Sequence, residues 1–449
     1  MPQIFRHVLR LCFWYLNFVA KMIRNDRNRS KDSRFFIKLY KRFLKNDQGR
    51  SKILNVARVD RPKFVELTFI GSGSYADVFR SKANGNFVLK MIRLLPEELL
   101  KRIQSSAVSR HTSYFDAYQE CRISDALSRL QNLIIKNRFY RCSIFPKIFS
   151  KFISKDIFLK HIESYQSFSE IECQYSIDPF EHFGLNVSRE NLLMVMEDCG
   201  QLMIDIIDDL HPYAFLSILK QIIVGLMIAE QVFEFEHRDL HSGNILLQPF
   251  HQHSIQFTYD NKVITIPSYG FLVKIIDTTF SRLKYDNIIY FKDMTYLFEN
   301  FEDKKCRRNN EKCPMRMQDR IYDQMSQVIQ NEWQKFHPKT NCIWIKYVIY
   351  KMRKSLSIRI QQQSPNVRNK NTCSSISSLT YANRVYRLLE HFNKLMDECS
   401  TLLECFQTII NDQSGLNDFV RISFFNNKDI GGGTGNSRSK QHIRAFQYG

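Results

Sequence analysis

The stretch EHRDLHSGNILL, from Glu236 to Leu247, contains an aspartate, a histidine two residues later and an asparagine five residues after the aspartate, directly before an apolar run. Two interpretations fit this order. In one, the stretch is a loop that brings a base to a hydroxyl group and an amide oxygen to a metal ion. In the other, it is a polar turn between two elements of the core. The flanking sequence has to decide between them.

A strand-rich pattern precedes this stretch. Between Lys63 and Leu94, apolar residues alternate around a glycine-rich turn and a second turn at Asn84 to Asn86, which predicts three strands. Glycines at 71 and 73 in GSGSYADV let backbone amides approach phosphate oxygens, and Lys90 on the following strand supplies an ammonium group for the same phosphates. Each signal alone also fits a plain glycine hairpin or a surface lysine.

A helix-rich pattern follows. Tyr114 to Leu130 has a rough helical period and carries Glu120, which could pair with Lys90. Residues 131–170 predict an insertion of mixed structure. The remaining elements expected are a buried strand at Leu192–Met196, a long apolar helix at Phe215–Phe235, strands at Ile245–Leu247 and Phe271–Asp277, and helices from there to about Phe406. We therefore expect a strand-rich part and a helix-rich part joined at Glu197 to Gly200, with a ligand site in the crevice between them.

The composition narrows the class of protein. The net charge of +20 favours an anionic partner such as chromatin, nucleic acid or nucleotide phosphates, although a solvated surface accounts for it equally well. The 11 cysteines are scattered without a CxxC pair, which favours a reducing compartment and argues against a zinc site. The apolar run from Leu11 to Ala20 is too short to span a membrane, so we expect no membrane partner.

Several of these elements, in this order, resemble a protein kinase. Kinases carry HRDLxxxxN, in which the aspartate takes the proton of the attacking hydroxyl and the asparagine binds magnesium. Here these residues are Asp239 and Asn244. IIDTT then places Asp277 thirty-three residues after Asn244, at the end of an apolar strand, where a carboxylate would bind the magnesium that bridges the phosphates. With Lys90, the pattern predicts binding of ATP and Mg.

One kinase family is resembled more closely. His241 stands where most kinases have lysine, Asp-Thr-Thr replaces Asp-Phe-Gly at Asp277, and no Ala-Pro-Glu motif follows. The chain resembles the haspin family of atypical serine/threonine protein kinases, whose corresponding triplet is Asp-Tyr-Thr. The resemblance rests on ECRISDALSRL (120–130), ITIPSYGFLVKIIDTTFSRL (264–283) and QDRIYDQMSQVIQNEWQKFHPKTNCIWIKYVIYKM (318–352). It covers the chain from about Pro62 to Phe406.

The resemblance implies a bilobed, protein-kinase-like α+β fold. A small, mainly antiparallel β N-lobe with one key helix would occupy residues 61–196, a hinge 197–200, and a larger, mainly α C-lobe 201–410. Residues 1–60 would form a basic N-terminal extension and residues 411–449 a flexible tail.

The resemblance also implies a role for individual residues. Asp239 would be the base, Lys90 and Glu120 an ion pair, and Asn244 and Asp277 the magnesium ligands. Met196 would control access to the adenine pocket, and the backbone of Glu197 would form hydrogen bonds with the adenine. The full nucleotide-binding set would be Gly71, Ser72, Gly73, Val78, Val88, Lys90, Met196, Glu197 and Gly200. Ala76 and Val88 depart from the glycine and alanine usual in kinases at these two positions.

Haspins phosphorylate a threonine near the N-terminus of histone three in mitosis. The resemblance therefore implies a monomeric, chromosome-associated nuclear kinase, with the cytoplasm as a second location, that acts on a basic tail while its basic extensions contact nucleosomal DNA. Two sets of acids would receive such a tail: Asp198, Asp205, Asp208 and Asp209, and Asp293, Glu299, Glu302 and Asp303. The missing Phe-Gly and Ala-Pro-Glu elements suggest a site assembled without activating phosphorylation.

Three alternatives stay open. Small-molecule kinases of the aminoglycoside and choline type share a D-L-H-x-G-N loop, although they usually have glycine where Arg238 stands. A pseudokinase scaffold commonly lacks at least one of the catalytic residues, all of which are present here. A purely DNA-binding protein is supported by charge alone.

Overall fold

The computed structural model describes residues 67–73, 76–81, 87–95, 111–155, 190–299, 316–362, 373–412 and 421–424. Several predictions lie outside these ranges. They are the N-terminal extension with its apolar run, the turn at 84–86, residues 156–170 of the insertion, most of the C-terminal tail, and the acids Glu302 and Asp303.

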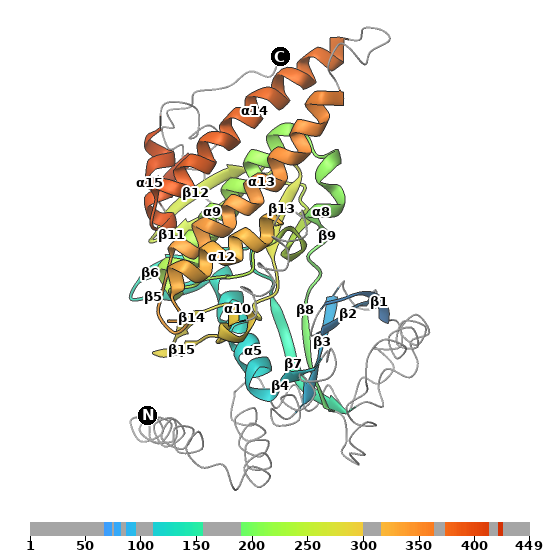
Figure 1. Ribbon diagram of the computed structural model, residues 1–449, viewed down its shortest axis with the longest axis vertical. Coiled ribbons are helices and arrows are strands. Elements are labelled where there is room, and N and C mark those ends of the chain that lie inside the picture. The colour runs from blue at the N-terminus through green and yellow to red at the C-terminus, as the bar shows by residue number, and fades with distance from the viewer. Residues whose placement is uncertain are drawn as a thin grey trace, which may run out of the picture.

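The strand-rich part is an antiparallel sheet with the strand order β1-β2-β3-β8-β7. The strands are β1 (Leu67–Ser72), β2 (Ala76–Ser81), β3 (Phe87–Leu95), β7 (Ile148–Lys155) and β8 (Glu190–Glu197). A short strand, β4 (Thr112–Ser113), pairs with β3 in parallel. The three strands expected before Leu95 and the buried strand at 192–196 are confirmed (Figure 1).

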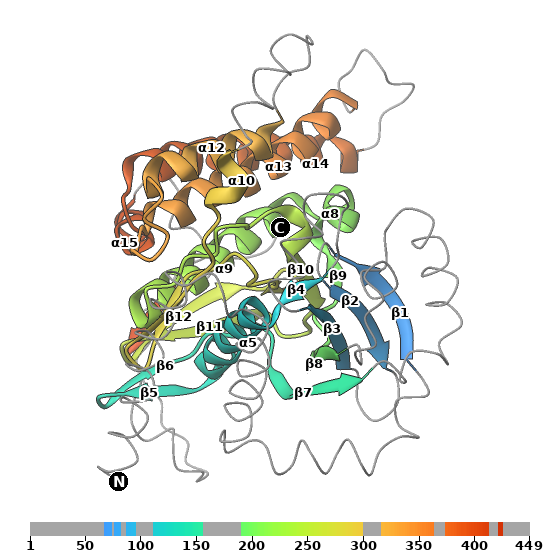
Figure 2. The same ribbon diagram turned by 60° about the horizontal axis from the view of Figure 1, so that its bottom comes forward.

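In the described part of the chain, one helix lies beside this sheet. α5 (Tyr114–Ser128) begins at Ser113, whose hydroxyl accepts the Asp116 amide at 3.0 Å and so satisfies an N-terminal donor of the helix. Ala117 and Cys121 belong to a buried cluster with residues of β3 and β8 such as Ile92. This packing fixes which face of α5 turns toward the sheet, and Figure 2 shows the helix beside β3, β4 and β7.

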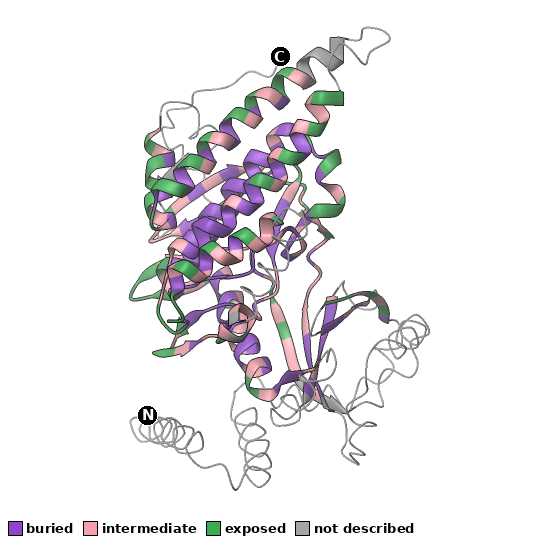
Figure 3. Ribbon diagram, viewed as in Figure 1, coloured by how far each residue is buried: buried purple, intermediate pink, exposed green. Residues whose placement is uncertain are grey.

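The helix-rich part is built around α9 (Pro212–Phe233). α9 begins with proline in its first turn, where the ring removes no needed hydrogen bond, and ends at Glu234 in the left-handed region at φ 48°. α9 is long and apolar enough to cross a membrane. However, 94% of the 18-residue stretch that gives it this character is buried inside the protein, as in a core helix (Figure 3). α13 (Lys339–Gln362), α14 (Cys373–Glu398) and α15 (Leu402–Asn411) pack against α9, and α12 (Met317–Ile329) packs against α13.

Short strands and helical turns complete this part. The sheets are β9 (Gln201–Leu202) with β10 (Ile245–Pro249) and β13 (Phe271–Ile275); β11 (Ser254–Tyr259) with β12 (Lys262–Pro267) and β16 (Arg421–Phe424); β14 (Leu283–Tyr285) with β15 (Ile288–Tyr290); and β5 (Leu133–Ile135) with β6 (Arg138–Tyr140). The helical pieces are α8 (Met203–Ile206), α10 (Thr295–Glu299), η2 (Arg129–Gln131), η4 (Ile207–Asp209) and η5 (Ser242–Asn244).

The expectation of helices throughout the segment after Asp277 was wrong for Leu283 to Tyr290, which form the β14–β15 hairpin. Its turn residues, Asp286 and Asn287, have φ angles of 51° and 60°, a left-handed conformation that these two residue types adopt most readily after glycine. The flanking apolar residues Ile288 and Ile289 favour strands. The Asp-Asn pair between apolar residues therefore could have predicted this hairpin from the sequence.

Candidate active site

Three charged side chains from three elements meet between the sheet and the helix-rich part. Lys90 of β3 lies 2.6 Å from Oε1 of Glu120 on α5 and 3.4 Å from Oδ1 of Asp277, which follows β13. In chain position Glu120 and Asp277 are 30 and 187 residues from Lys90. The fold therefore gathers the three residues that the sequence named as an ion pair and a metal ligand.

In this cluster, the positive and negative groups each favour the ionised form of the other. Burial disfavours the Lys90 ammonium, but the carboxylates of Asp277 and Glu120 outweigh it and raise the pKa of Lys90. Burial also opposes ionisation of Asp277, but the Lys90 ammonium and hydrogen bonds from Thr279 outweigh it and lower its pKa to about 2. At neutral pH the site thus holds a fixed ammonium group beside an ionised carboxylate.

Two threonines after Asp277, to which no local signal gave a role, tie this segment to α5. The Thr279 hydroxyl lies 2.6 Å from Oδ1 of Asp277 and 3.0 Å from Oε2 of Glu120. The Thr278 hydroxyl lies 2.9 Å from that of Ser124 and donates to the Glu120 carbonyl at 3.3 Å. The Asp-Thr-Thr triplet therefore holds the helix that carries Glu120 through side-chain hydroxyls, where Asp-Phe-Gly offers none.

The loop that holds Asp239 and Asn244 lies against the same segment. Nδ2 of Asn244 donates to the Asp239 carbonyl at 2.9 Å, and the Asn244 carbonyl accepts the Ile276 amide at 3.0 Å. His237 contacts the Ile276 carbonyl through Nε2 at 3.1 Å. These contacts place the Asp239 loop next to the residue before Asp277.

The Asp239 side chain is nearly buried. Burial raises its pKa well above the usual range; a hydrogen bond from Tyr322 acts in the opposite direction, and the neighbouring Asp277 adds to the increase. A carboxylate with a raised pKa accepts a proton more readily, which suits the role of base predicted for it.

Asn244 and Asp277 fit a magnesium ion by their chemistry. Because Nδ2 of Asn244 is used within the loop, the oxygen of its amide is the atom left for a cation. Asp277 is ionised, and hard oxygen ligands are those that magnesium prefers. In the part of the chain that the structure describes, no group of three or more His, Cys, Asp and Glu side chains could hold a metal alone. Such an ion would therefore depend on the phosphates of a nucleotide for further ligands.

The strand register puts the residues expected to line a nucleotide pocket on one face of the sheet. Val78 is opposite Lys90 across β2 and β3, and Met196 is opposite Val88 across β3 and β8. Val88 and Lys90 are two residues apart in one strand and so share a face. These four side chains therefore lie on the same side of the sheet.

Among the described residues, none crowds the two glycines of the glycine-rich turn. A Cβ atom added to Gly71 would meet nothing within 4 Å, and one added to Gly73 would come no closer than 3.8 Å to the Ala76 carbonyl. Internal packing therefore does not require glycine at either position, whereas close approach of a phosphate would. The Ser72 hydroxyl donates to Oδ1 of Asp77 at 2.5 Å, so this side chain braces the turn.

The connection between the two parts, Glu197 to Gly200, is held by contacts to the strand-rich part and to the helix-rich part. The Glu197 carboxylate pairs with Lys274 at 2.8 Å, and its amide donates to the Lys147 carbonyl at 2.9 Å. Among the described side chains, the Cys199 thiol donates to the Glu197 carbonyl at 3.3 Å, a weak hydrogen bond that the amino group of adenine could displace. Gly200, at φ 87°, is required by packing, because a Cβ there would lie 2.4 Å from the Leu247 carbonyl.

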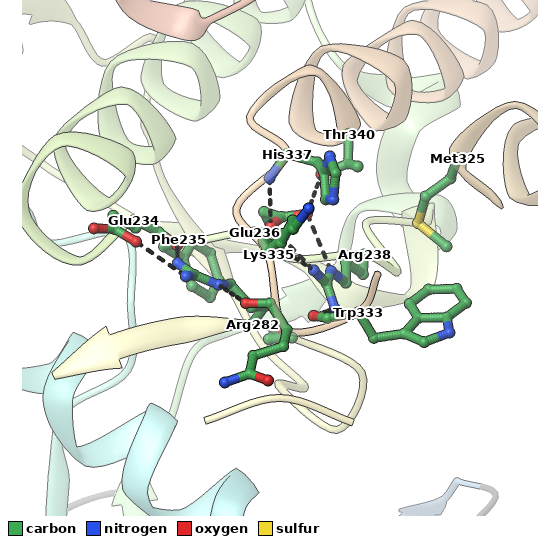
Figure 4. A network of polar contacts seen from close by, with 12 residues as sticks. Glu234, Phe235, Glu236, Arg238, Arg282, Met325, Trp333, Lys335, His337 and Thr340 are labelled. Atoms are coloured by element: carbon green, nitrogen blue, oxygen red, sulfur yellow. Dashed lines mark hydrogen bonds and ion pairs between the residues drawn. The ribbon is translucent and has the colours of Figure 1, made fainter. Parts of the chain in front are cut away.

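A buried network encloses the Asp239 loop from the α12–α13 side (Figure 4). Arg238 donates to both oxygens of Glu236, at 3.1 and 3.0 Å, and to the carbonyls of Trp333 and Lys335. Glu236 also accepts the His337 amide at 2.9 Å. Neither Glu236 nor Arg238 is exposed at all. Apart from Arg238, the partners of Glu236 are His337 and Thr340, about a hundred residues further along the chain, so no local signal in the sequence gave Glu236 a role.

Asn341 secures the same loop. Its amide donates to the Glu230 carboxylate at 2.8 Å and to the Phe235 carbonyl at 2.9 Å, and its Oδ1 accepts the His237 amide at 3.0 Å. His337 and Asn341 are two of the residues that carry the family resemblance after residue 318. In this chain, these two residues contact the HRDLHSGN loop and the residues just before it, and so hold the loop in place.

Comparison with known proteins agrees with this geometry. Residues 33–401 match the family described as haspin like kinase domain. The serine/threonine-protein kinase haspin homolog of Drosophila melanogaster is 36% identical over 141 residues, 31% of this chain and 23% of that protein. The haspin of Mus musculus is 36% identical over 151 residues, 33% of this chain and 18% of that protein.

A longer match is found with the haspin homolog hrk1 of Schizosaccharomyces pombe, 23% identical over 371 residues, which is 70% of this chain and 66% of that protein. The chain thus spans about a fifth of the length of the fly and mouse relatives. The family match covers most of the chain and includes every residue of the site described above. The resemblance noted in the sequence is confirmed, and the chain belongs to the haspin-like kinase family.

Proposed function

We propose that this protein is a serine/threonine protein kinase with a bilobed kinase fold, which transfers the γ-phosphoryl group of Mg-ATP to a threonine or serine of a basic protein tail. The observation that carries the proposal is the meeting of Lys90, Glu120 and Asp277 at one point, beside the loop of Asp239 and Asn244. These are the groups that phosphoryl transfer requires.

Each residue would contribute a separate part of the reaction. Lys90, held by Glu120, would bind phosphate oxygens, and the glycine-rich turn would cover them. Asp239 would accept the proton of the substrate hydroxyl as its oxygen bonds to the γ-phosphorus and the bond to ADP breaks. Asn244 and Asp277 would hold magnesium, which supplies neutralisation of the phosphate charge.

The contacts of Arg238 support a site that needs no activating phosphate. In many kinases activation-loop phosphorylation works through new arginine–phosphate pairs. Here all three nitrogens of the Arg238 guanidinium already donate within the protein, to Glu236, Trp333 and Lys335. These bonds account for four of the five N–H groups, and the guanidinium is fully buried, so a phosphate group could not reach this arginine.

The position of α5 supports the same conclusion. In addition to Thr278 and Thr279, Gln119 accepts the Phe291 amide at 2.8 Å, and Asp116 pairs with Lys292 at 3.2 Å. The segment after Asp277 thus holds α5, and with it Glu120, through several contacts.

Treatment with a protein phosphatase is therefore expected to leave kcat and the KM for ATP of the purified protein unchanged. The control is a protein kinase with a phosphorylated activation loop, which should lose activity in the same treatment. A large loss of activity of this chain, reversed by rephosphorylation, would show that a phosphate gates the site.

A basic tail such as that of histone three is the proposed substrate, in chromatin and in the nucleus. Asp205, Asp208 and Asp209 are exposed near the end of the connection, although the Ser355 hydroxyl donates to Asp208 at 2.6 Å. Asp198 is less accessible, because it pairs with Arg80 at 2.8 Å. Local carboxylates of this kind can attract a basic peptide even where the net charge of +20 repels it.

The substrate class is tested by phosphate transfer from Mg-ATP to a histone-three tail peptide, to the same peptide with its threonines replaced by valine, and to an acidic peptide of equal length. We expect phosphothreonine in the first alone, mapped by mass spectrometry. Preferential labelling of the acidic peptide would contradict the proposed substrate. Basic extensions binding nucleosomal DNA would add a salt-dependent preference for nucleosomes over the free tail.

A further inference from the structure

A tyrosine from a distant helix contacts the side chain of the proposed base. The hydroxyl of Tyr322, on α12, donates to Oδ1 of Asp239, 83 residues away in the chain. The inference that follows rests on the proposed function, because it concerns the base of that reaction.

Packing holds the Tyr322 ring independently of its hydroxyl. The ring lies edge-on to Trp344, with centroids 5.0 Å apart and an interplanar angle of 85°, and edge-on to Phe298 at 6.4 Å. Trp344 is fully buried and its indole nitrogen lies 3.3 Å from the Met325 sulfur, on the same helix as Tyr322. The aromatic contacts therefore place the ring, and the hydroxyl serves another purpose.

The surroundings of Asp239 distinguish its two carboxylate oxygens. Oδ1 takes the Tyr322 hydroxyl, while Oδ2 lies 3.7 Å from Nε2 of His241, beyond hydrogen-bond distance. Nδ1 of His241 accepts the Gly243 amide at 3.0 Å, so that nitrogen is turned into the loop. The backbone of Asp239 is fixed through its carbonyl by Asn244. Rotation of the carboxylate about its own bond is the freedom that the Tyr322 hydroxyl removes.

We propose that Tyr322 is a positioning residue for the proposed base: its hydroxyl holds Oδ1 of Asp239 and leaves Oδ2 as the oxygen that accepts the proton of the substrate hydroxyl. A carboxylate fixed in this way meets the hydroxyl without first reorienting, which favours the transition state over the bound ground state. Tyr322 also couples the position of α12 to the Asp239 loop.

Tyr322→Phe keeps the ring and removes the hydroxyl. The kcat for peptide phosphorylation is expected to fall about ten- to a hundredfold, the range for a hydrogen bond to a charged group. The KM for ATP should stay unchanged, because the nucleotide is bound by Lys90 and the glycine-rich turn. The matched control is Tyr347→Phe, which removes the hydroxyl of a buried tyrosine whose ring contacts the same Trp344 ring, with centroids 6.0 Å apart. Both variants are checked by thermal unfolding.

A double-mutant cycle separates positioning from a merely structural role. In the Asp239→Asn background, Tyr322→Phe is expected to cause no further loss of kcat, since the group it positions is already gone. Additive losses would assign Tyr322 to the structure of the loop and overturn the proposal. So would an unchanged kcat of the single variant. An increase in kcat would mean that the tyrosine competes with the substrate for Asp239, which also overturns it.

Failure of this inference can be told from failure of the proposed function. If the wild-type chain and Tyr347→Phe transfer phosphate and Tyr322→Phe equals them, only the positioning role is wrong. If none of the three transfers phosphate to any basic peptide, the proposed function is wrong and the role of Tyr322 with it.

Discussion

Asp277→Asn is expected to lower kcat for phosphate transfer by about a thousandfold, the scale seen when one group that stabilises transition-state charge is removed. The asparagine keeps the shape of the side chain but removes the negative charge, which Lys90 stabilises so strongly that the pKa of Asp277 is about 2. Magnesium would lose an ionised ligand. The measurement is single-turnover transfer at saturating Mg-ATP, with binding of ATP measured separately without magnesium.

The control for this variant is Asp286→Asn. Asp286 is exposed in the turn of the β14–β15 hairpin at φ 51°, a conformation that asparagine also adopts, so activity should not change. Turnover by Asp277→Asn at a rate near that of the control would contradict the metal-binding role. ATP binding with no turnover in any variant, the wild type included, would favour a pseudokinase scaffold.

Glu236→Gln is expected to lower the free energy of unfolding by about 3–5 kcal/mol, the cost of removing one partner from a buried ion pair. Glu236 and Arg238 are both fully buried, and the Glu236 carboxylate accepts from Arg238, His337 and Thr340 (Figure 4). A glutamine amide cannot accept at both ends, and the guanidinium charge would stay buried without its counterion. Chemical denaturation followed by fluorescence measures the change.

Glu234→Gln is the matched control, because the same substitution is made two residues earlier. Glu234 pairs with Arg282 and Lys284, but its side chain is 36% exposed and water can replace these contacts, so the expected loss is well below that for the fully buried Glu236. Equal and small losses of stability in the two variants would show that the Glu236–Arg238 pair does not hold the loop.

The parts of the site that the sequence predicted are those with local signals. The glycine-rich turn, the strand of Lys90 and the HRDLHSGN loop each have a pattern that can be read within about ten residues. Their order along the chain then suggested a shared site. The register of β2, β3 and β8 brings Val78, Val88 and Met196 to the face that carries Lys90.

The contacts that the sequence did not predict are long-range or depend on a single hydroxyl. Nothing local marks Tyr322 as a partner of Asp239, because in a helix such as α12 a tyrosine is ordinarily a packing residue. The Glu236–Arg238 pair looks local, but its burial depends on the segment from Trp333 to His337. The resemblance to haspins pointed to that segment without showing what it contacts.

The most direct test of the central claim compares the wild-type chain with Asp239→Asn in phosphate transfer from Mg-ATP to a histone-three tail peptide, with ATP affinity measured in parallel. The account predicts phosphothreonine with the wild type, transfer lowered about a hundredfold or more by the substitution, and equal ATP affinity for the two proteins. Transfer at equal rates by both proteins, or no transfer by the wild type to any basic peptide, would contradict it.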